Sequence, residues 1–316
     1  MKRYTMFFLL LLTGSFIQAQ ALKNFTIEES VLQERTFAPQ RVQQLDWIPG
    51  TEKFAYAKIV DGEQQLLAGE AASTKREVLC NLEDFNNAMK AAGFPLRNAL
   101  PALRLISSTS FRFLEGNTFC KYDWVAKKVE KLTSYNANGQ NIDINDQHGV
   151  AYTIAQNLYI SLPGKPDIAV TNEKSQDIRH GEPAHRNEFG INKGTFWSPN
   201  GNMLAFYRVD ESMVTNYPLF NLHNHPATPE VVKYPFAGEK SHHATLGIYN
   251  TATAKTVYLQ TTGDPEHYLT NITWSPDEKS IYVVELNRDQ NKLAVNRYNA
   301  ATGAFERTLF EESDDK

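Results

Sequence analysis

The residues best suited to bind or react lie together in one polar segment, residues 180–191. This segment contains a carboxylate at Glu188, the imidazoles of His180 and His185, and the guanidinium of Arg186. Its glycines permit tight backbone turns, and its pattern fits neither a strand nor a regular helix. By composition alone the segment is typical of an ordinary loop between strands, so its chemistry depends on what surrounds it.

The signatures of common catalytic and cofactor sites are absent from the sequence. There is no G-x-S-x-G serine elbow, no H-E-x-x-H, no Gly-rich phosphate loop and no C-x-x-C. His223 and His225 stand at alternate positions that could hold a metal, but no third ligand is near and residues 218–229 are expected to form a loop. His242 and His243 are expected to face solvent. We therefore predict no metal, no cofactor and no catalytic residue in this chain.

Composition excludes several classes of protein. Hydrophobic residues make up 41% and charged residues 22% of the 316 residues, which is ordinary for a soluble globular protein. The formal net charge of −4 argues against nucleic-acid binding, which normally needs a basic face. Two cysteines, Cys80 and Cys120, are too few for a disulfide scaffold; they either pair once or remain as two core thiols.

The first 21 residues have the form of a secretory signal peptide. Lys2 and Arg3 give a positive start, residues 7–12 are an unbroken apolar run, and Ala19-Gln20-Ala21 is a small-x-small cleavage site. The apolar run is too short to span a membrane. We predict an exported protein, periplasmic or secreted, whose mature chain begins at residue 22 and has no membrane span.

The rest of the chain is dominated by short strands. Helices are predicted over Thr26–Gln33, where acidic residues favour a helix N-terminus, and over Leu82–Ala92, which Gly93 stops. Elsewhere strands alternate with turns, among them the paired strands 113–124 and 129–132. A pattern of strand end, polar or proline turn and alternating strand recurs. Its copies begin at Trp47, Ile144, Trp197 and Trp274.

This repeat predicts an all-β protein that forms part of a β-propeller, with short helical insertions. Each copy is a hairpin whose turn is fixed by proline and a polar residue, with the tryptophan packing on the neighbouring unit. The spacing of the copies fits four-stranded blades, which must stack on one another to bury both faces. About four to five blades are expected; a large β-sandwich is the rival on periodicity alone. The polar end at residues 311–316 suggests a truncated piece of a longer protein.

Several stretches, taken in order, resemble one known family. The first are residues 184–191, A-H-R-N-E-F-G-I, and residues 196–208, which begin F-W-S-P-N-G. A single W-S-P-N turn occurs in many propellers, whereas the ordered set over roughly 100 residues is specific. The chain resembles the N-terminal propeller of dipeptidyl peptidase IV and its bacterial relatives. Further matches lie at Asp210-Glu211 and at residues 234–238, 267–274 and 287–291.

The resemblance implies an eight-bladed propeller followed by an α/β-hydrolase domain with a Ser-Asp-His triad. Such enzymes remove dipeptides, or in some members tripeptides, preferably after proline. A propeller loop presents glutamate to the substrate's free α-amino group, and Glu188 is the matching position. Asn187 stands where the animal enzymes have a second glutamate, and Arg186 is expected to shape the loop. The family's propeller arginine has no counterpart, because Arg112 lies in another part of its strand pair.

The implied function of residues 22–316 is to gate substrate and anchor peptide N-termini in an exported serine-type peptidase, a hydrolase active in proteolysis. With the hydrolase domain absent, the chain alone is expected to be inactive. Peptides with a free N-terminus are the expected partners, and the full-length enzyme is a candidate homodimer. The alternative is a non-catalytic propeller that binds peptides or a partner protein. A glycan-processing propeller would need a carboxylate pair at a central pocket, and no such pair is evident.

Overall fold

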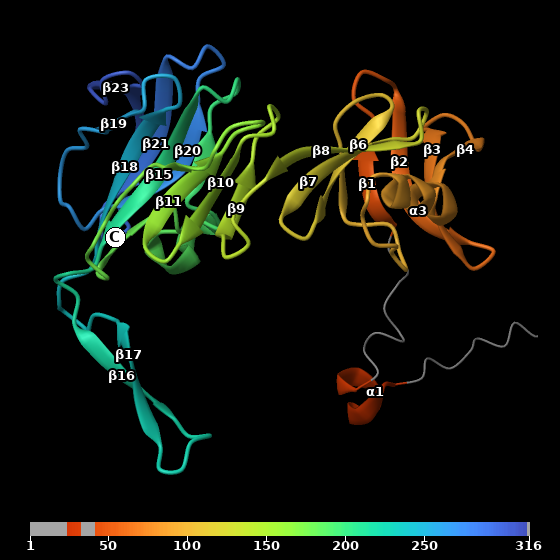
Figure 1. The fold of residues 1–316 in the computed structure, drawn as a ribbon. Coiled ribbons are helices and arrows are strands. Elements are labelled where there is room, and N and C mark those ends of the chain that lie inside the picture. Colours follow the sequence, from red (N-terminus) through yellow and green to blue (C-terminus); the bar gives the residue numbers. More distant parts are fainter. Residues whose placement is uncertain (1–23, 33–41, 315–316) are drawn as a thin grey trace, which may run out of the picture. The chain divides into compact units, whose positions relative to one another are not determined.

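The computed structural model describes residues 24–32 and 42–314 (Figure 1). The predicted signal peptide, residues 1–21, lies outside the described residues. The chain divides into two units at Val42 and Gln43, and each is described by itself. The first contains α1 (Ile27–Val31), where Thr26 accepts from the Glu29 backbone N–H and the Glu29 carboxylate accepts from Thr26. This capping box confirms the predicted helix start.

The second unit consists mainly of five antiparallel sheets, here named blades 1 to 5 in chain order. Blade 1 comprises β1 (Gln43–Trp47), β2 (Lys53–Val60), β3 (Glu63–Glu70) and β4 (Arg76–Asn81). Blade 2 comprises β5 (Leu103–Leu105), β6 (Ser110–Glu115), β7 (Thr118–Asp123) and β8 (Lys128–Ser134). Blade 3 comprises β9 (Gln140–Ile144), β10 (Val150–Ile154), β11 (Asn157–Ser161) and β12 (Ile168–Ala169).

Blade 4 is the largest sheet among the described residues, and it carries an extra hairpin. It comprises β13 (Ile178–His180), β14 (Thr195–Trp197), β15 (Met203–Asp210), β18 (His243–Asn250) and β19 (Lys255–Tyr258). Between β15 and β18 the chain forms the hairpin of β16 (Asn216–Asn221) and β17 (Thr228–Lys233). Blade 5 comprises β20 (Tyr268–Trp274), β21 (Ser280–Leu286), β22 (Lys292–Asn299) and β23 (Phe305–Ser313).

The recurring W-S-P turn determines where blade strands begin. In blade 4 the Ser198 hydroxyl accepts from the Met203 backbone N–H at 2.9 Å, and in blade 5 Ser275 does the same for Ser280 at 3.0 Å. Trp197 and Trp274 face the preceding blade, as predicted, whereas Trp47 in blade 1 is 60% exposed and contacts Phe54 of its own sheet. Trp274 Nε1 donates to the Phe196 carbonyl at 3.0 Å, and Trp197 Nε1 to the Asp143 carbonyl at 3.3 Å. One local motif therefore both closes a hairpin and joins two blades.

The hydrophobic core lies between successive blades rather than inside any one sheet. Between blades 1 and 2 it includes α3 (Leu82–Ala91), which buries Phe85 and Met89 and ends before Gly93 at φ 80°. The free thiols of Cys80 and Cys120 are buried in the same cluster. Five stacked antiparallel sheets confirm the predicted partial propeller with helical insertions.

Two predicted segments are wrong. The strand expected over residues 113–124 is two strands, because Glu115-Gly116-Asn117 turns the chain, with Gly116 at φ 57°. The loop expected over residues 218–229 belongs largely to the β16–β17 hairpin, in which Pro218 pairs with Val231 and Pro229 with Phe220. Prolines hid that alternation, since they are rare inside strands.

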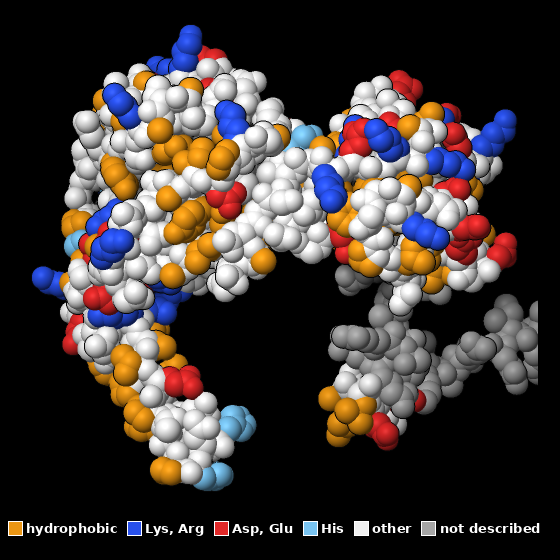
Figure 2. Space-filling model, in the orientation of Figure 1, with side chains coloured by type: hydrophobic (Ala, Val, Ile, Leu, Met, Phe, Trp, Pro, Cys, Tyr) orange, Lys and Arg blue, Asp and Glu red, His pale blue; other side chains and the backbone are white. Residues whose placement is uncertain are grey.

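The β16–β17 hairpin exposes many apolar side chains. Figure 2 shows these hydrophobic side chains gathered along it. No helix within the described ranges is long and apolar enough to cross a membrane. The exposed large apolar side chains of the hairpin are Leu219, Phe220, Leu222, Val231 and Val232.

Candidate functional site

The polar segment predicted from the sequence connects β13 to β14 in blade 4. Its centre is a short turn, η1 (His185–Gly190), so it is neither a strand nor a regular helix, as predicted. The backbone is left-handed at His185, Arg186, Asn187 and Phe189, with φ between 52° and 63°. Such conformations cost roughly 1–2 kcal/mol for each non-glycine residue, so surrounding contacts must hold the turn.

His185 is the buried anchor of this turn, with 4% of its surface exposed. Its Nε2 accepts from the Leu269 backbone N–H in β20 at 3.1 Å, and its Nδ1 lies 3.0 Å from Nε2 of His242. The ring also contacts Tyr268, with ring centroids 5.1 Å apart. His185 therefore joins η1 to blade 5 and to the start of β18.

These contacts assign the proton positions in the histidine pair. Because Nε2 of His185 accepts a hydrogen bond, its proton sits on Nδ1 and is donated to His242. His242 then carries its proton on Nδ1, which faces the Ser241 hydroxyl at 3.4 Å. Burial, then neighbouring histidines, lowers the pKa of His185 to about 3. Burial, then Arg186 and Arg179, lowers the pKa of His242 to about 4, so both rings are neutral near pH 7.

The expectation that His242 and His243 face solvent is therefore wrong. Both side chains are partly buried, and His242 packs against His185 with ring centroids 4.9 Å apart. Residues 57 positions apart meet here because β18 pairs with β15 beside η1. Nothing local to the His-His pair indicated this contact.

Two further side chains fasten the turn. The Arg186 guanidinium donates to the Lys233 carbonyl at the end of β17 and lies over the Tyr234 ring, 4.8 Å from its centre. The Phe189 ring meets Tyr268 edge-on at 4.9 Å. Both ends of η1 are thus tied to neighbouring elements, which compensates for its left-handed backbone.

Arg186, Asn187, Glu188 and Phe189 are all exposed, but Arg186 and Phe189 contact neighbouring elements through their side chains. Within the described part of the chain, the Glu188 carboxylate has no hydrogen bond or ion pair. Glu188 is extended, at φ −67° and ψ 163°, between left-handed residues on either side. The turn is therefore held at both ends and presents one carboxylate without a partner among the described residues.

The turn separates two cavities. His185, Arg186 and Asn187 line one of about 350 Å³. Residues 189–193 line another of about 180 Å³. The structure thus brings Arg186 and Asn187 to the larger cavity, whereas Glu188 is not among the lining residues of either cavity. The larger cavity is also lined by Arg179, Glu182, Pro183, Ala184, Val209, Glu211 and His242.

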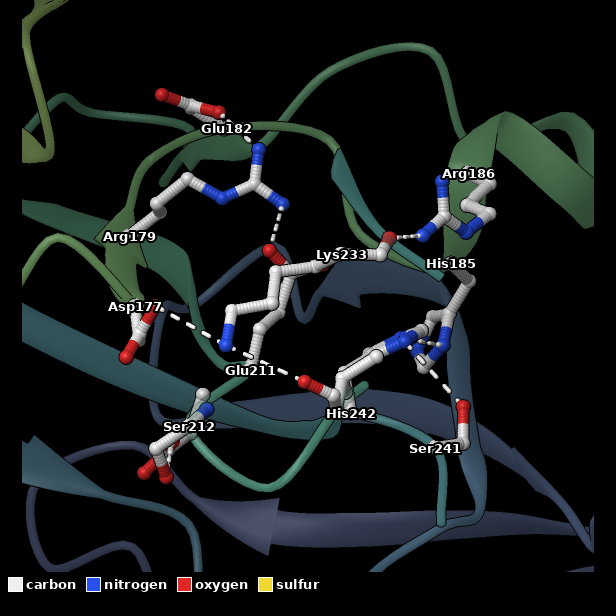
Figure 3. Close-up of polar contacts among 12 residues, drawn as sticks. Asp177, Arg179, Glu182, His185, Arg186, Glu211, Ser212, Lys233, Ser241 and His242 are labelled. Carbon is white, nitrogen blue, oxygen red and sulfur yellow. Dashed lines mark hydrogen bonds and ion pairs between the residues drawn. The ribbon is translucent and has the colours of Figure 1, made fainter. Parts of the chain in front are cut away.

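Figure 3 shows a network of alternating charges, of which Arg179, Glu182 and Glu211 line the larger cavity. Arg179 Nη1 lies 2.9 Å from Glu182, and Nη2 lies 3.0 Å from Glu211. Lys233 pairs with Asp177 at 3.4 Å. Arg179 Nε is buried and without a hydrogen-bond partner among the described residues, so the cavity keeps an unused donor.

Sequence reasoning missed this network. Arg179 precedes the predicted segment and Glu182 lies within it, but neither carries a motif, and Glu211 entered only through the resemblance. Lys233 reaches the site because the hairpin returns the chain there. Among the described residues, no group of histidine, cysteine, aspartate and glutamate side chains could hold a metal ion.

The fold and the site together define a class of protein: a propeller region that presents an anchored polar turn from one blade. The family described as dipeptidyl peptidase IV (DPP IV) N-terminal region matches residues 102–316, and the chain belongs to this family. Dipeptidyl aminopeptidase B of Saccharomyces cerevisiae is 30% identical over 141 residues, 41% of this chain and 17% of that protein. A protein assigned as dipeptidyl-aminopeptidase B in Pyrenophora tritici-repentis is 28% identical over 204 residues, 54% of this chain and 22% of that protein.

Two solved structures share the fold. A Bacteroides ovatus protein assigned as a dipeptidyl aminopeptidase IV has 37% identity and a TM-score of 0.78, over 88% of this chain and 38% of that one. Porphyromonas gingivalis dipeptidyl peptidase 4 has 20% identity and a TM-score of 0.67, over 93% and 43%. The chain spans about a fifth of the length of the curated relatives it matches.

Proposed function

We propose that residues 22–316 are the substrate-gating and N-terminus-anchoring propeller region of an exported serine-type peptidase. The full-length enzyme would release dipeptides, or tripeptides, after proline, with the nucleophile supplied by a hydrolase domain. Family membership supports the class of enzyme. The observation that carries the anchoring role is Glu188, an exposed carboxylate without a partner among the described residues, on a turn fastened at both ends.

The chemistry of this anchor is electrostatic. A carboxylate that binds the peptide's α-ammonium group fixes how many residues reach the nucleophile beyond it. Two unit charges 4 Å apart attract by about 4 kcal/mol at an effective dielectric of 20, before the cost of desolvation. Removing one partner of such a desolvated pair costs about 2–5 kcal/mol. Asn187 adds an amide beside this carboxylate rather than a second charge.

The test is the Glu188→Gln variant of the full-length gene product, assayed with Gly-Pro-p-nitroanilide. Loss of the charge is expected to lower kcat/KM by roughly 30- to 5000-fold, which is the free-energy range above expressed as a ratio. Glu52→Gln is the matched control, because it makes the same chemical change at an exposed position of blade 1. Unchanged kcat/KM in Glu188→Gln would show that the amine is bound elsewhere.

The same experiment addresses the non-catalytic alternative. A propeller that only binds peptides would retain a Gly-Pro peptide in equilibrium dialysis and release no p-nitroaniline. In that case the full-length product would show Glu188-dependent binding without turnover.

A further inference from the structure

We infer that His185 is a positioning residue for Glu188. This inference rests on the proposed role of Glu188 as the amine anchor, and it assigns a distinct task to a buried imidazole three residues away. His185 forms part of the wall of the larger cavity, but only 4% of its surface is exposed and both its ring nitrogens are already bonded within the protein. It acts by fixing the backbone from which Glu188 projects.

The backbone of the turn has an unusual conformation. Left-handed conformations at His185, Arg186 and Asn187 place the backbone where L-residues rarely stay without help. Within the turn, the bond from the Asn187 N–H to the Ala184 carbonyl is long, at 3.3 Å, and one bond of ordinary length, from the Ile191 N–H to the Glu188 carbonyl at 3.0 Å, closes its end. The start of the turn therefore depends on side-chain contacts, of which those of His185 are the most deeply buried.

His185 also contacts the backbone of blade 5. Leu269 in β20 is held at both of its backbone polar groups by side chains of blade 4. Its N–H donates to His185 Nε2, and its carbonyl accepts from the Tyr207 hydroxyl at 2.7 Å. Because Leu269 is itself fully buried, this backbone is a rigid reference point. The hydrogen bond from Leu269 therefore sets the start of η1 relative to two blades.

The two hydrogen bonds of the His185 ring run in opposite directions. Nε2 of His185 must accept and Nδ1 must donate, so the two ring nitrogens have separate tasks. A glutamine amide oxygen can take the place of Nε2, whereas an asparagine amide reaches only as far as Nδ1. The two amides therefore separate the Leu269 contact from the His242 contact.

The experiment measures KM and kcat of these two variants in the full-length enzyme, with a free-amine dipeptide substrate. His185→Gln retains an acceptor for Leu269 and is expected to keep KM within about threefold of wild type. His185→Asn loses that acceptor and is expected to raise KM by about 10-fold or more, with a smaller change in kcat, since the catalytic groups are elsewhere.

His180 supplies the matched control. It is buried to the same extent, at 4% exposed, in the same blade, but its backbone and ring face the Gln156 carbonyl instead of η1. His180→Asn is therefore expected to lower stability and leave KM within about twofold. An equal rise of KM in both asparagine variants would overturn the inference, because the effect would then be general loosening of blade 4.

A double-variant cycle tests whether His185 acts through Glu188. On the Glu188→Gln background, His185→Asn is expected to raise KM by less than about threefold, since the group it positions is gone. A full, additive rise would overturn the inference. If His185→Asn does not fold, the cycle is run with His242→Phe, which removes the partner of Nδ1 and should raise KM by about threefold; that rise should disappear on the Glu188→Gln background, and a rise that persists there would overturn the inference.

Failure of this inference is distinguishable from failure of the proposed function. If Glu188→Gln leaves KM unchanged, the anchor itself is wrong and both fall. If Glu188→Gln raises KM but His185→Asn does not, the anchor stands and His185 is not what positions it.

Discussion

Acidification should destabilise the region around η1, because His185 and His242 are held neutral in the folded chain. Folding lowers the pKa of His185 from an ordinary 6.5 to about 3, mainly through burial. The unfolded chain therefore binds one more proton than the folded chain between those two values. Stability is complete above about pH 6.5 and is lost as the pH falls toward the folded-state pKa.

The magnitude follows from one proton per histidine. Each pH unit inside the window costs about 1.4 kcal/mol for each neutral histidine. Between about pH 6.5 and pH 5, His185 accounts for roughly 2 kcal/mol. His242, whose pKa is lowered to about 4, accounts for a similar amount over the same range. A combined loss of about 4 kcal/mol is large against the 5–15 kcal/mol of a typical domain.

The assay is urea unfolding of wild type and of His185→Gln at about pH 7, 6 and 5, followed by tryptophan fluorescence. Trp197 and Trp274 report on blades 4 and 5, where both histidines lie. The variant cannot take up the proton, so its stability should fall by roughly 2 kcal/mol less than that of wild type over this range. Carboxylates that titrate in both proteins cancel in the comparison. Identical pH dependence in the two proteins would refute the reasoning.

Two other outcomes follow from buried groups. Tyr207→Phe leaves the Leu269 carbonyl without its donor, so urea unfolding should show a loss of roughly 1–3 kcal/mol, whereas Tyr234→Phe at the surface should change little. Equal losses would contradict this assignment. Burial raises the pKa of Cys80 to about 12 and that of Cys120 to about 11. Neither thiol should react with Ellman's reagent at about pH 8 until urea is added, and rapid labelling of the native protein would contradict their burial.

Local signals made most of the fold predictable. The W-S-P turn works within a few residues, since Ser198 caps the turn that begins the next strand. Its tryptophan could be expected to pack on the neighbouring blade, which holds for Trp197 and Trp274 but not for the exposed Trp47. Hydrophobic spacing and Gly93 likewise determined α3. Interactions of this range leave a pattern in the sequence.

The candidate site was only partly predictable, for physical reasons. The segment itself stood out, because its polar residues and glycines suit neither strand nor helix. Its supports did not, because the partner of His185 is 57 residues away and that of Arg186 is 47 residues away, beyond a hairpin. A left-handed backbone is usually predicted from glycine, and here it is formed by histidine, arginine and asparagine, so the sequence did not indicate it. Only the packed blades show that these side chains converge.

The central claim is that Glu188 binds the free N-terminus of a peptide. The most direct measurement is the ratio of kcat/KM for a free-amine peptide to that for its N-acetylated form, in the full-length enzyme and in Glu188→Gln. We expect a large preference for the free amine in wild type that falls to near unity in Glu188→Gln, while Glu52→Gln retains it. A preference that persists unchanged without the Glu188 charge would contradict the assignment of Glu188 as the amine anchor.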